Sequence, residues 1–552
     1  MVIFKDFSIS FKGIKVINNL NFKIKSNSIL GIVGESGSGK SLTSLALIGL
    51  LPKTAKVSGK INFLDTELFS LSEKEFQKYR GKEISMIFQE PMSSLNPTIT
   101  CGKQVAEILS IHTKLSKQEI REEVTSLFEK VKLPRPKHIY DSFPHEISGG
   151  QKQRVMIAMA IACKPKLLIA DEPTTALDVT VQKEIILLLK NLQLETQMSI
   201  LFISHDLNLV SEIADDVLVM YKGEIVEYGN TTSVFKNPKE NYTKALINSK
   251  PKENVRLKKL PTVKDFINET VENSVFSKEE RKVYHEKIYS TTPFLEVKNL
   301  KKEFISKSFL FTKPNVVKAV NDVSFSLYQG ETLGLVGESG CGKSTLVRTI
   351  LQLEKATNGE IFYQGKDITK LNTKELKLMR KDIQIIFQDP FSSLNPRKTV
   401  GEAILEPMTV HKILSHKKER KDYVLELFKN VGLDVTHYDR YPHEFSGGQR
   451  QRIGIARAIA LQPKLLICDE SVSALDVSIQ AQILNLLNEL KLKYNFTYIF
   501  ISHDLSVVKY MSDQLIVMNA GQIEEIGDAD EIYTNPKKEY TKTLISAIPK
   551  GI

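Results

Sequence analysis

The chain of 552 residues contains one long sequence twice, and this internal repeat limits its possible folds more than any other feature. FPHEISGGQKQR at 143–154 returns as YPHEFSGGQRQR at 441–452. The tails of the copies also match, because NPKENYTKALI at 237–247 returns as NPKKEYTKTLI at 535–545. Copies of this length are two folded domains rather than the short units of a solenoid.

The repeat divides the chain into three parts. We predict a first domain over 1–251, a charge-rich connector with some helix over 252–292, and a second domain over 293–552. Each copy opens with alternating, strand-like sequence, and apolar strands then alternate with helical segments, which predicts the α/β class with a mixed, mostly parallel sheet. The segment from about 97 to 164 has a helical pattern and is predicted to form an inserted subdomain.

Composition argues against several classes of protein. No stretch approaches the roughly 18 apolar residues of a membrane-spanning helix, and the first residues lack a secretory signal, so we expect a cytosolic protein. The four cysteines (Cys101, Cys163, Cys341 and Cys468) lie far apart, which argues against disulfides or a zinc site. The net charge of +11 is spread along the chain, which favours a mildly basic surface over a nucleic-acid or membrane-binding patch.

A glycine-rich turn in each copy satisfies the phosphate-loop pattern, as GESGSGKS and as GESGCGKS. Glycines let backbone N–H groups converge on phosphates, and the N-terminus of the following helix adds partial positive charge. Each lysine is predicted to reach the β- and γ-phosphates of ATP, and the serine after it to offer a hydroxyl to Mg²⁺. The predicted nucleotide-binding residues are Gly34, Glu35, Ser36, Gly37, Ser38, Gly39, Lys40 and Ser41, with Gly337, Glu338, Ser339, Gly340, Cys341, Gly342, Lys343 and Ser344.

An acidic pair follows an apolar strand in each copy. Asp171 and Asp469 can hold Mg²⁺, and Glu172 and Glu470 are placed to act as general bases on the attacking water. Such a pair alone is more often a charge pair at a helix N-terminus. Its matching position after both phosphate loops favours the catalytic interpretation.

The sequence ISGGQ at 147–151, which returns as FSGGQ at 445–449, carries the resemblance to a family. With it, the chain resembles the ABC ATPases, which implies two tandem P-loop NTPase domains. A serine at the N-cap of a helix would explain the motif in one copy. It would not explain why the motif occurs in both copies, each time at the position that it has in the family. The resemblance implies that the γ-phosphate bound by the opposite domain is gripped by Ser148, Gly149, Gly150, Ser446, Gly447 and Gly448.

The same resemblance assigns roles to further polar residues. Gln89 and Gln388 match the loop that touches Mg²⁺ and the attacking water and meets the membrane subunits. His205 and His503 match the switch histidine that contacts the γ-phosphate. The resemblance thus implies ATP and Mg²⁺ as the bound molecules.

An aromatic residue stacks on adenine in this family. Phe11 lies 29 residues before Lys40, at the family's usual distance. The second copy has an insertion there, so Phe304 is either the adenine contact or a core residue.

SSLNP, PHE and the NPxxxYT tails are similar to those of the dipeptide, oligopeptide and nickel importers. This implies a peripheral protein on the cytoplasmic face of the inner (plasma) membrane, with two permease subunits and an external solute-binding protein as partners, no nucleic acid, and intramolecular pairing of its two domains. Many members carry a cysteine cluster for an iron–sulfur centre. No cysteine follows Tyr242 or Tyr540 in the tails, so no such cluster is expected. Ser471 stands where Pro173 lies in the first copy, which is expected to loosen the turn slightly.

The leading hypothesis is therefore the ATPase subunit of a peptide-class importer. One alternative is a soluble tandem ABC protein that acts on ribosomes or DNA, whose NHLD and SHDR sequences and zinc-binding cysteines are absent from this chain. Another is an importer ATPase for nickel or a sugar. Sugar-importer ATPases that are fused usually have one degraded site, whereas both copies here keep lysine, glutamate and histidine.

Overall fold

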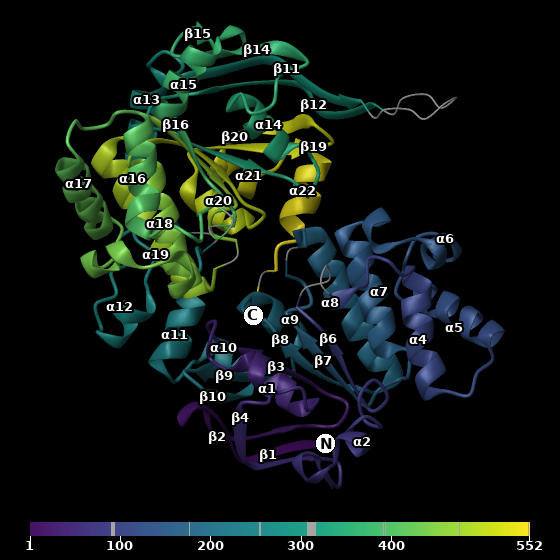
Figure 1. The fold of residues 1–552 in the computed structure, drawn as a ribbon. Helices are drawn as coiled ribbons and strands as arrows, with labels where there is room; N and C mark the ends of the chain where they lie inside the picture. Colours follow the sequence, from purple (N-terminus) through teal and green to yellow (C-terminus); the bar gives the residue numbers. More distant parts are fainter. Residues whose placement is uncertain are drawn as a thin grey trace. The chain divides into compact units, whose positions relative to one another are not determined.

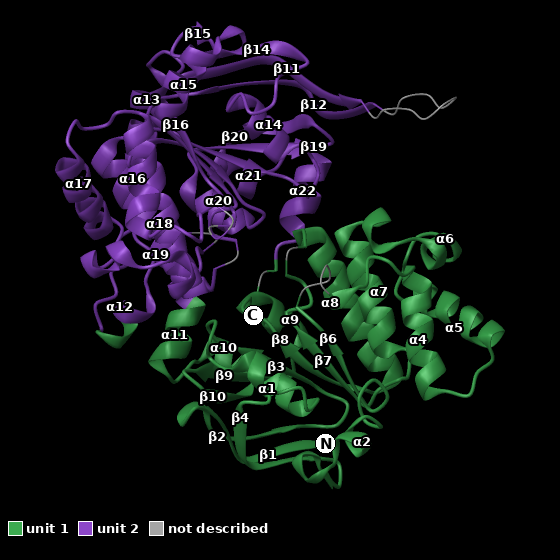
Figure 2. Ribbon diagram, in the orientation of Figure 1, with its two compact units in different colours: residues 1–247, 266–268, 549–552 green, residues 248–265, 269–548 purple. Residues whose placement is uncertain are grey.

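The computed structural model describes residues 1–89, 94–175, 177–252, 255–305, 316–389, 391, 393–473, 475–549 and 551. It forms two compact units (Figures 1 and 2). Unit 1 contains Met1–Ile247, Phe266–Asn268 and Pro549–Ile552, and unit 2 contains Asn248–Asp265 and Glu269–Ile548. None of the helices described is both long and apolar enough to cross a membrane.

A mixed six-stranded sheet forms the centre of unit 1, in the order β10-β9-β3-β8-β7-β6. All neighbours are parallel except β9 and β10, which confirms the predicted α/β class. Strands β3, β7 and β8 are buried along their whole length, as expected for strands covered on both faces. The strands are β3 (Ile29–Val33), β6 (Ile84–Ile87), β7 (Leu167–Asp171), β8 (Ser199–Ile203), β9 (Asp216–Tyr221) and β10 (Glu224–Asn230).

A second, antiparallel sheet of unit 1 has the order β2-β1-β4-β5. Apolar residues of both sheets and of α1 (Lys40–Leu47) form one hydrophobic core. The alternating sequence at the start of the chain therefore does form strands, with one face in the core. These strands are β1 (Val2–Phe11), β2 (Ile14–Ile24), β4 (Ala55–Phe63) and β5 (Thr66–Glu67).

The predicted helical insertion consists of α4 (Cys101–His112), α5 (Lys117–Lys130), α6 (Pro136–Asp141) and α7 (Gly149–Ile161) (Figure 1). A short helix, α2 (Glu73–Phe76), precedes it. The remaining helices of unit 1 are α8 (Val179–Thr196), α9 (Leu207–Ile213), α10 (Thr231–Lys236) and α11 (Asn241–Asn248).

Unit 2 repeats this architecture, with sheets β16-β17-β18-β13-β19-β20 and β12-β11-β14-β15. The strands are β11 (Leu295–Ile305), β12 (Val316–Leu327), β13 (Thr332–Val336), β14 (Asn358–Tyr363), β15 (Lys366–Asp367), β16 (Ile383–Ile386), β17 (Leu465–Asp469), β18 (Thr497–Ile501), β19 (Gln514–Asn519) and β20 (Gln522–Asp528). The helices are α14 (Lys343–Ile350), α15 (Thr373–Asp382), α16 (Val400–Val410), α17 (Lys417–Asn430), α18 (Gly447–Ile459), α19 (Val477–Tyr494), α20 (Leu505–Met511), α21 (Ala529–Thr534) and α22 (Glu539–Ser546).

Much of the charge-rich segment expected as a connector packs against unit 2. It contains α12 (Val263–Ile267) and α13 (Lys278–Tyr289), and its Leu260 is fully buried. The backbone of Leu260 exchanges two hydrogen bonds with the side chain of Asn485, at 2.9 and 2.8 Å. Arg281 of α13 forms ion pairs with Asp528 and Asp530.

Candidate functional site

The phosphate loop of unit 1 lies between β3 and α1, and its geometry requires glycine. Gly39 has a φ of +102°, and a Cβ there would lie 2.1 Å from Cδ1 of Ile17. Lys40 is only 6% exposed, and its Nζ donates hydrogen bonds to the carbonyl oxygens of Gly34 at 2.7 Å and Glu35 at 2.9 Å. The loop therefore holds a buried ammonium group at the N-terminus of a helix, where anions bind.

The loop of unit 2 has the same geometry. Gly342 has a φ of +109°, and a Cβ there would lie 2.1 Å from the carbonyl oxygen of Ala319. Nζ of Lys343 donates to Gly337 O at 2.7 Å and to Glu338 O at 2.9 Å. Two separate sequences thus produce the same arrangement of lysine and backbone.

Three side chains donate hydrogen bonds to, or closely approach, Glu172, the residue after β7. Its Oε2 accepts from Gln89 Nε2 at 3.1 Å and from Thr175 Oγ1 at 2.9 Å, and it lies 3.1 Å from Nδ1 of His205. The backbone of Glu172 has a φ of +48°, a conformation that is unfavourable for a residue with a Cβ. Strain of this kind is concentrated at functional sites, where the surrounding structure maintains it.

Unit 2 repeats this group around Glu470, whose φ is also +48°. Oε2 of Glu470 accepts from Gln388 Nε2 at 2.7 Å and lies 3.7 Å from Nδ1 of His503. The structure therefore brings together the glutamine, glutamate and histidine that the sequence singled out in each copy.

The two adjacent carboxylates at the end of β7 have pKa values that move in opposite directions. Burial and the neighbouring charge of Glu172 raise the pKa of Asp171 to about 6. Burial also opposes ionisation of Glu172, but the hydrogen bond and charge of His205 outweigh it and lower that pKa to about 2. In unit 2, burial raises the pKa of Asp469, and the nearby imidazole of His503 lowers the pKa of Glu470.

The surroundings of Asp171 fit a divalent cation. Its side chain is 5% exposed, and its Oδ1 has no hydrogen-bond partner within the part of the chain that the structure describes. The hydroxyl of Ser41 lies near enough to Asp171 to oppose the rise in its pKa, so a hydroxyl stands beside the carboxylate. Carboxylate and hydroxyl oxygens are suitable Mg²⁺ ligands.

The serine and glycines of SGGQ begin α7 in unit 1 and α18 in unit 2. Ser148 and Ser446 are the N-caps. The Oγ of each serine accepts a hydrogen bond from the backbone N–H of the glutamine three residues later, at 3.3 Å. The capping role is therefore real. Contact of these residues with a nucleotide stays a prediction.

The two aromatic candidates for adenine differ in burial. Phe11 ends β1 and is partly buried against the hydrophobic core of unit 1. Phe304 is 43% exposed on β11, with Nζ of Lys302 4.9 Å from the centre of its ring. Adenine stacking by either residue stays a prediction.

Sequence analysis missed two tyrosines beside the phosphate loops. Oη of Tyr242 in α11 accepts a hydrogen bond from the backbone N–H of Glu35 at 3.2 Å. Oη of Tyr540 in α22 accepts from the N–H of Glu338 at 3.3 Å. The signal in the sequence is the NPxxxYT tail that both copies share, whose tyrosine is Tyr242 in the first copy and Tyr540 in the second.

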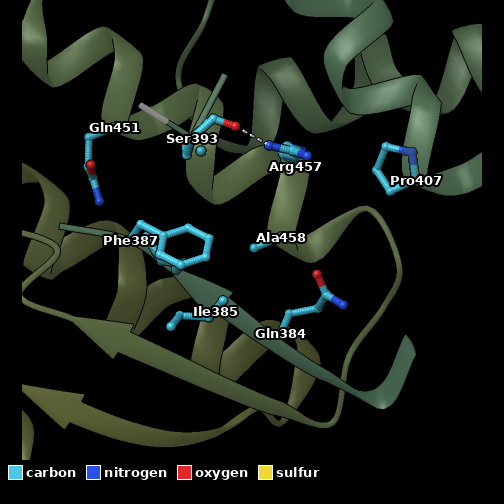
Figure 3. A pocket seen from close by; sticks show the side chains of 10 residues that line it. Gln384, Ile385, Phe387, Ser393, Pro407, Gln451, Arg457 and Ala458 are labelled. Atoms are coloured by element: carbon cyan, nitrogen blue, oxygen red, sulfur yellow. Dashed lines mark hydrogen bonds between the residues drawn. The ribbon is translucent and has the colours of Figure 1, made fainter. Parts of the chain in front are cut away.

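A cavity of about 140 Å³ opens beside β16 in unit 2 (Figure 3). Arg457 of α18 lies at its edge and donates a hydrogen bond to the carbonyl oxygen of Ser393. Gly454, one turn earlier on α18, would have no atom within 4 Å of an added Cβ. In α7 of unit 1, Met156 stands at the position of Gly454 and is buried. The remaining lining residues are Gln384, Ile385, Ile386, Phe387, Pro407, Gln451 and Ala458.

Comparison with known proteins shows which family the chain resembles. The family model "ABC transporter" matches residues 17–175 and 320–473, and the model "Oligopeptide/dipeptide transporter, C-terminal region" matches 226–275 and 525–551. The chain is 46% identical over 97% of its length to proteins named "Glutathione import ATP-binding protein GsiA" from Escherichia coli (strain K12) and from Shigella boydii serotype 4 (strain Sb227), and it covers 87% of each. A solved structure, the ATP-binding cassette MJ0796 bound to ADP and Pi, is 29% identical over 43% of this chain and 98% of its own, with a TM-score of 0.39.

Proposed function

Because the chain belongs to the ABC transporter family of ATP-binding proteins, we propose that it is the ATP-hydrolysing subunit of an importer for small peptides. The relatives named as glutathione import proteins make glutathione the first solute to test. The observation that carries the proposal is the group formed in each unit by a buried phosphate-loop lysine and a strained glutamate with its glutamine and histidine.

In this proposal the lysines bind the β- and γ-phosphates of ATP, and the glutamates take a proton from the attacking water. Mg²⁺, when bound, neutralises charge that develops on the phosphates. In unit 1 it would be held by Ser41, Asp171 and Gln89, and in unit 2 by Ser344, Asp469 and Gln388.

The contacts of Glu172 provide a way in which binding of ATP could activate this residue as a base. With His205 beside it, Glu172 has a pKa of about 2 and is a weak base. A γ-phosphate that attracts His205 would remove this interaction, and the basicity of Glu172 would rise. Binding of the nucleotide and activation of the base would thus be one event.

We further propose that the two units pair head to tail, as the family resemblance implies. The Lys40 site would then be completed by Ser446, Gly447 and Gly448, and the Lys343 site by Ser148, Gly149 and Gly150. Gly150→Asp should reduce photo-crosslinked ATP analogue mainly on the second half, and Gly448→Asp mainly on the first. If each substitution depleted its own half, head-to-tail pairing would be wrong.

The partners we propose are two membrane permeases, reached at the cytoplasmic face of the plasma membrane, and an external solute-binding protein. The cavity beside β16 adjoins the segment that carries Gln388, which is the loop that meets membrane subunits in this family. Purification in mild detergent, with mass spectrometry of the bound proteins, tests this point. Recovery of ribosomal proteins in place of permeases would favour the alternative function.

Catalysis is tested by Glu172→Gln combined with Glu470→Gln. The double variant should bind ATP but hydrolyse it about a hundred- to ten-thousand-fold more slowly, which is the usual effect of removing a general base. Glu195→Gln, which alters an exposed carboxylate paired with Lys130, is the matched control and should keep full activity. Near-normal turnover in the double variant would contradict the assigned role.

A further inference from the structure

The tail shared by both copies is attached to the phosphate loop by one recurring hydrogen bond. In unit 1 the hydroxyl of Tyr242 accepts from the N–H of Glu35, and the carbonyl oxygen of Glu35 accepts from Lys40 at 2.9 Å. One residue of the loop therefore joins the tail tyrosine to the phosphate-binding lysine. Unit 2 repeats the sequence of contacts with Tyr540, Glu338 and Lys343.

The tail itself is fixed before it reaches the loop. Glu227 of β10 accepts hydrogen bonds from the backbone N–H groups of Lys239, at 3.0 Å, and Glu240, at 3.4 Å, immediately before α11. In unit 2 Glu525 accepts from Lys537 at 3.0 Å and from Lys538 at 3.2 Å. Burial opposes ionisation of Glu525, yet these backbone hydrogen bonds hold its pKa below the usual range.

Packing holds the tyrosine in place as well. Tyr242 is 6% exposed, and its ring centre lies 4.3 Å from that of Tyr221 on β9. Thr243, the next residue, is also buried. A side chain with so little freedom loses little further entropy when it makes a hydrogen bond, so it can fix the position of its partner.

We propose that Tyr242 and Tyr540 are positioning residues of the two ATP sites, and that the C-terminal tail of each copy serves to hold the phosphate loop in its binding conformation. This inference rests on the proposed function, because it assumes that Lys40 and Lys343 bind ATP. The tail segments lie within the stretches that match the oligopeptide/dipeptide transporter C-terminal region, and the proposal gives part of that region a task at the nucleotide.

The test is Tyr242→Phe in a background of Lys343→Ala, measured as equilibrium binding of ATP to the full-length protein. The Lys343→Ala background leaves only the Lys40 site, so the number of ATP molecules bound per protein should fall from two to one. Loss of the hydroxyl should weaken ATP binding at that site about two- to tenfold, the effect expected for one hydrogen bond. The matched control is Tyr228→Phe, which removes a hydroxyl that donates to Lys23 O on the same unit and should leave affinity unchanged.

Hydrogen exchange distinguishes positioning from simple packing of the tail. In Tyr242→Phe without nucleotide, peptides that cover 34–41 should exchange faster, while those that cover 237–248 should change less. Saturating ATP should restore protection of the loop, and KM should rise more than kcat falls. Tyr540→Phe in a Lys40→Ala background should behave in the same way at the second site.

The outcomes separate the two proposals. Unchanged ATP affinity and unchanged exchange of 34–41 in Tyr242→Phe, with a stoichiometry of one, would overturn the positioning role alone. Faster exchange confined to 237–248 would also overturn it, because the tyrosine would then only stabilise the tail. A stoichiometry that stays at two in Lys343→Ala would instead contradict the proposed function.

Discussion

The adjacent carboxylates Asp171 and Glu172 should affect stability with opposite signs, and this can be tested without nucleotide. Burial raises the pKa of Asp171 from 3.8 to about 6, so its ionised form costs stability at neutral pH. Burial opposes ionisation of Glu172 as well, but His205 prevails and lowers its pKa from 4.5 to about 2, so its ionised form adds stability.

The expected size follows from the shifts. Each is about two pKa units, which corresponds to about 3 kcal/mol as an upper limit, since one unit is about 1.4 kcal/mol. A net change of about 2 kcal/mol in a domain of this size moves its melting temperature by about 4–8 °C. Asp171→Asn should therefore raise the melting temperature of unit 1, and Glu172→Gln should lower it.

The pH dependence gives a sharper test. The cost of Asp171 is fully present above its folded pKa of about 6 and is relieved as pH falls toward 3.8. The contribution of Glu172 is present above 4.5 and is lost only as pH falls toward 2. Between pH 7.5 and pH 5 the gain from Asp171→Asn should fall by about half, and the loss from Glu172→Gln should persist.

Scanning calorimetry of the nucleotide-free protein, without Mg²⁺, measures both effects. Asp469→Asn is the matched variant in unit 2 and identifies which transition belongs to which unit, since burial also raises the pKa of Asp469. A lower melting temperature for Asp171→Asn at pH 7.5 would refute the reasoning. A gain that does not change between pH 7.5 and pH 5 would refute it too.

Three further predictions concern the rest of the molecule. Gly454→Met should fill the cavity beside β16 and reduce co-purification of the permeases several-fold while basal ATP hydrolysis is unchanged; equal recovery would show that they bind elsewhere. Arg281→Ala removes a cation that pairs with both Asp528 and Asp530, while Arg256 still pairs with Asp530, and it should destabilise unit 2 by about 1–3 kcal/mol. Thermal proteolysis followed peptide by peptide should show early cleavage in 505–530 and none in unit 1. Protein purified without oxygen should contain no iron or sulfide and no broad visible absorption, because the four cysteines lack Cys₄ spacing, and stoichiometric iron would contradict this.

The sequence located the ends of the buried strands beside which the candidate site residues lie, and the roles of those residues at a nucleotide stay predictions. Lys40, Glu172 and His205 each follow a buried strand, and the carboxyl ends of parallel strands meet at one edge of a sheet. The family resemblance implied that Gln89 and His205 act at the same phosphate as Glu172, and in the structure both side chains lie beside Glu172. The helical insertion was also predictable, because its periodicity is local.

Contacts that depend on tertiary packing could not be predicted from the sequence. Tyr242 and Glu35 are 207 positions apart in the sequence. No rule of sequence spacing predicts a contact between a helix near the end of a domain's sequence and a loop near its beginning. The segment over 252–292 was expected to be a connector with some helix because it is rich in charged residues. Arg256 and Arg281 are instead largely buried, and their terminal NH groups donate hydrogen bonds to carbonyl and carboxylate groups of unit 2. Composition reports how many charges a segment has and says nothing about where their partners lie.

The docking of residues 255–289 also determines where the chain can be divided. Arg256 donates to the carbonyl oxygens of Lys509 and Ser512 at the end of α20, and His285 lies between Asp513 and Asp528. A second half that began at residue 293, where the sequence repeat resumes, would lose the contacts that Arg256 and His285 make with these groups. A split protein, whether made in the laboratory or encoded as two genes, should therefore retain this segment as an N-terminal extension of its second half.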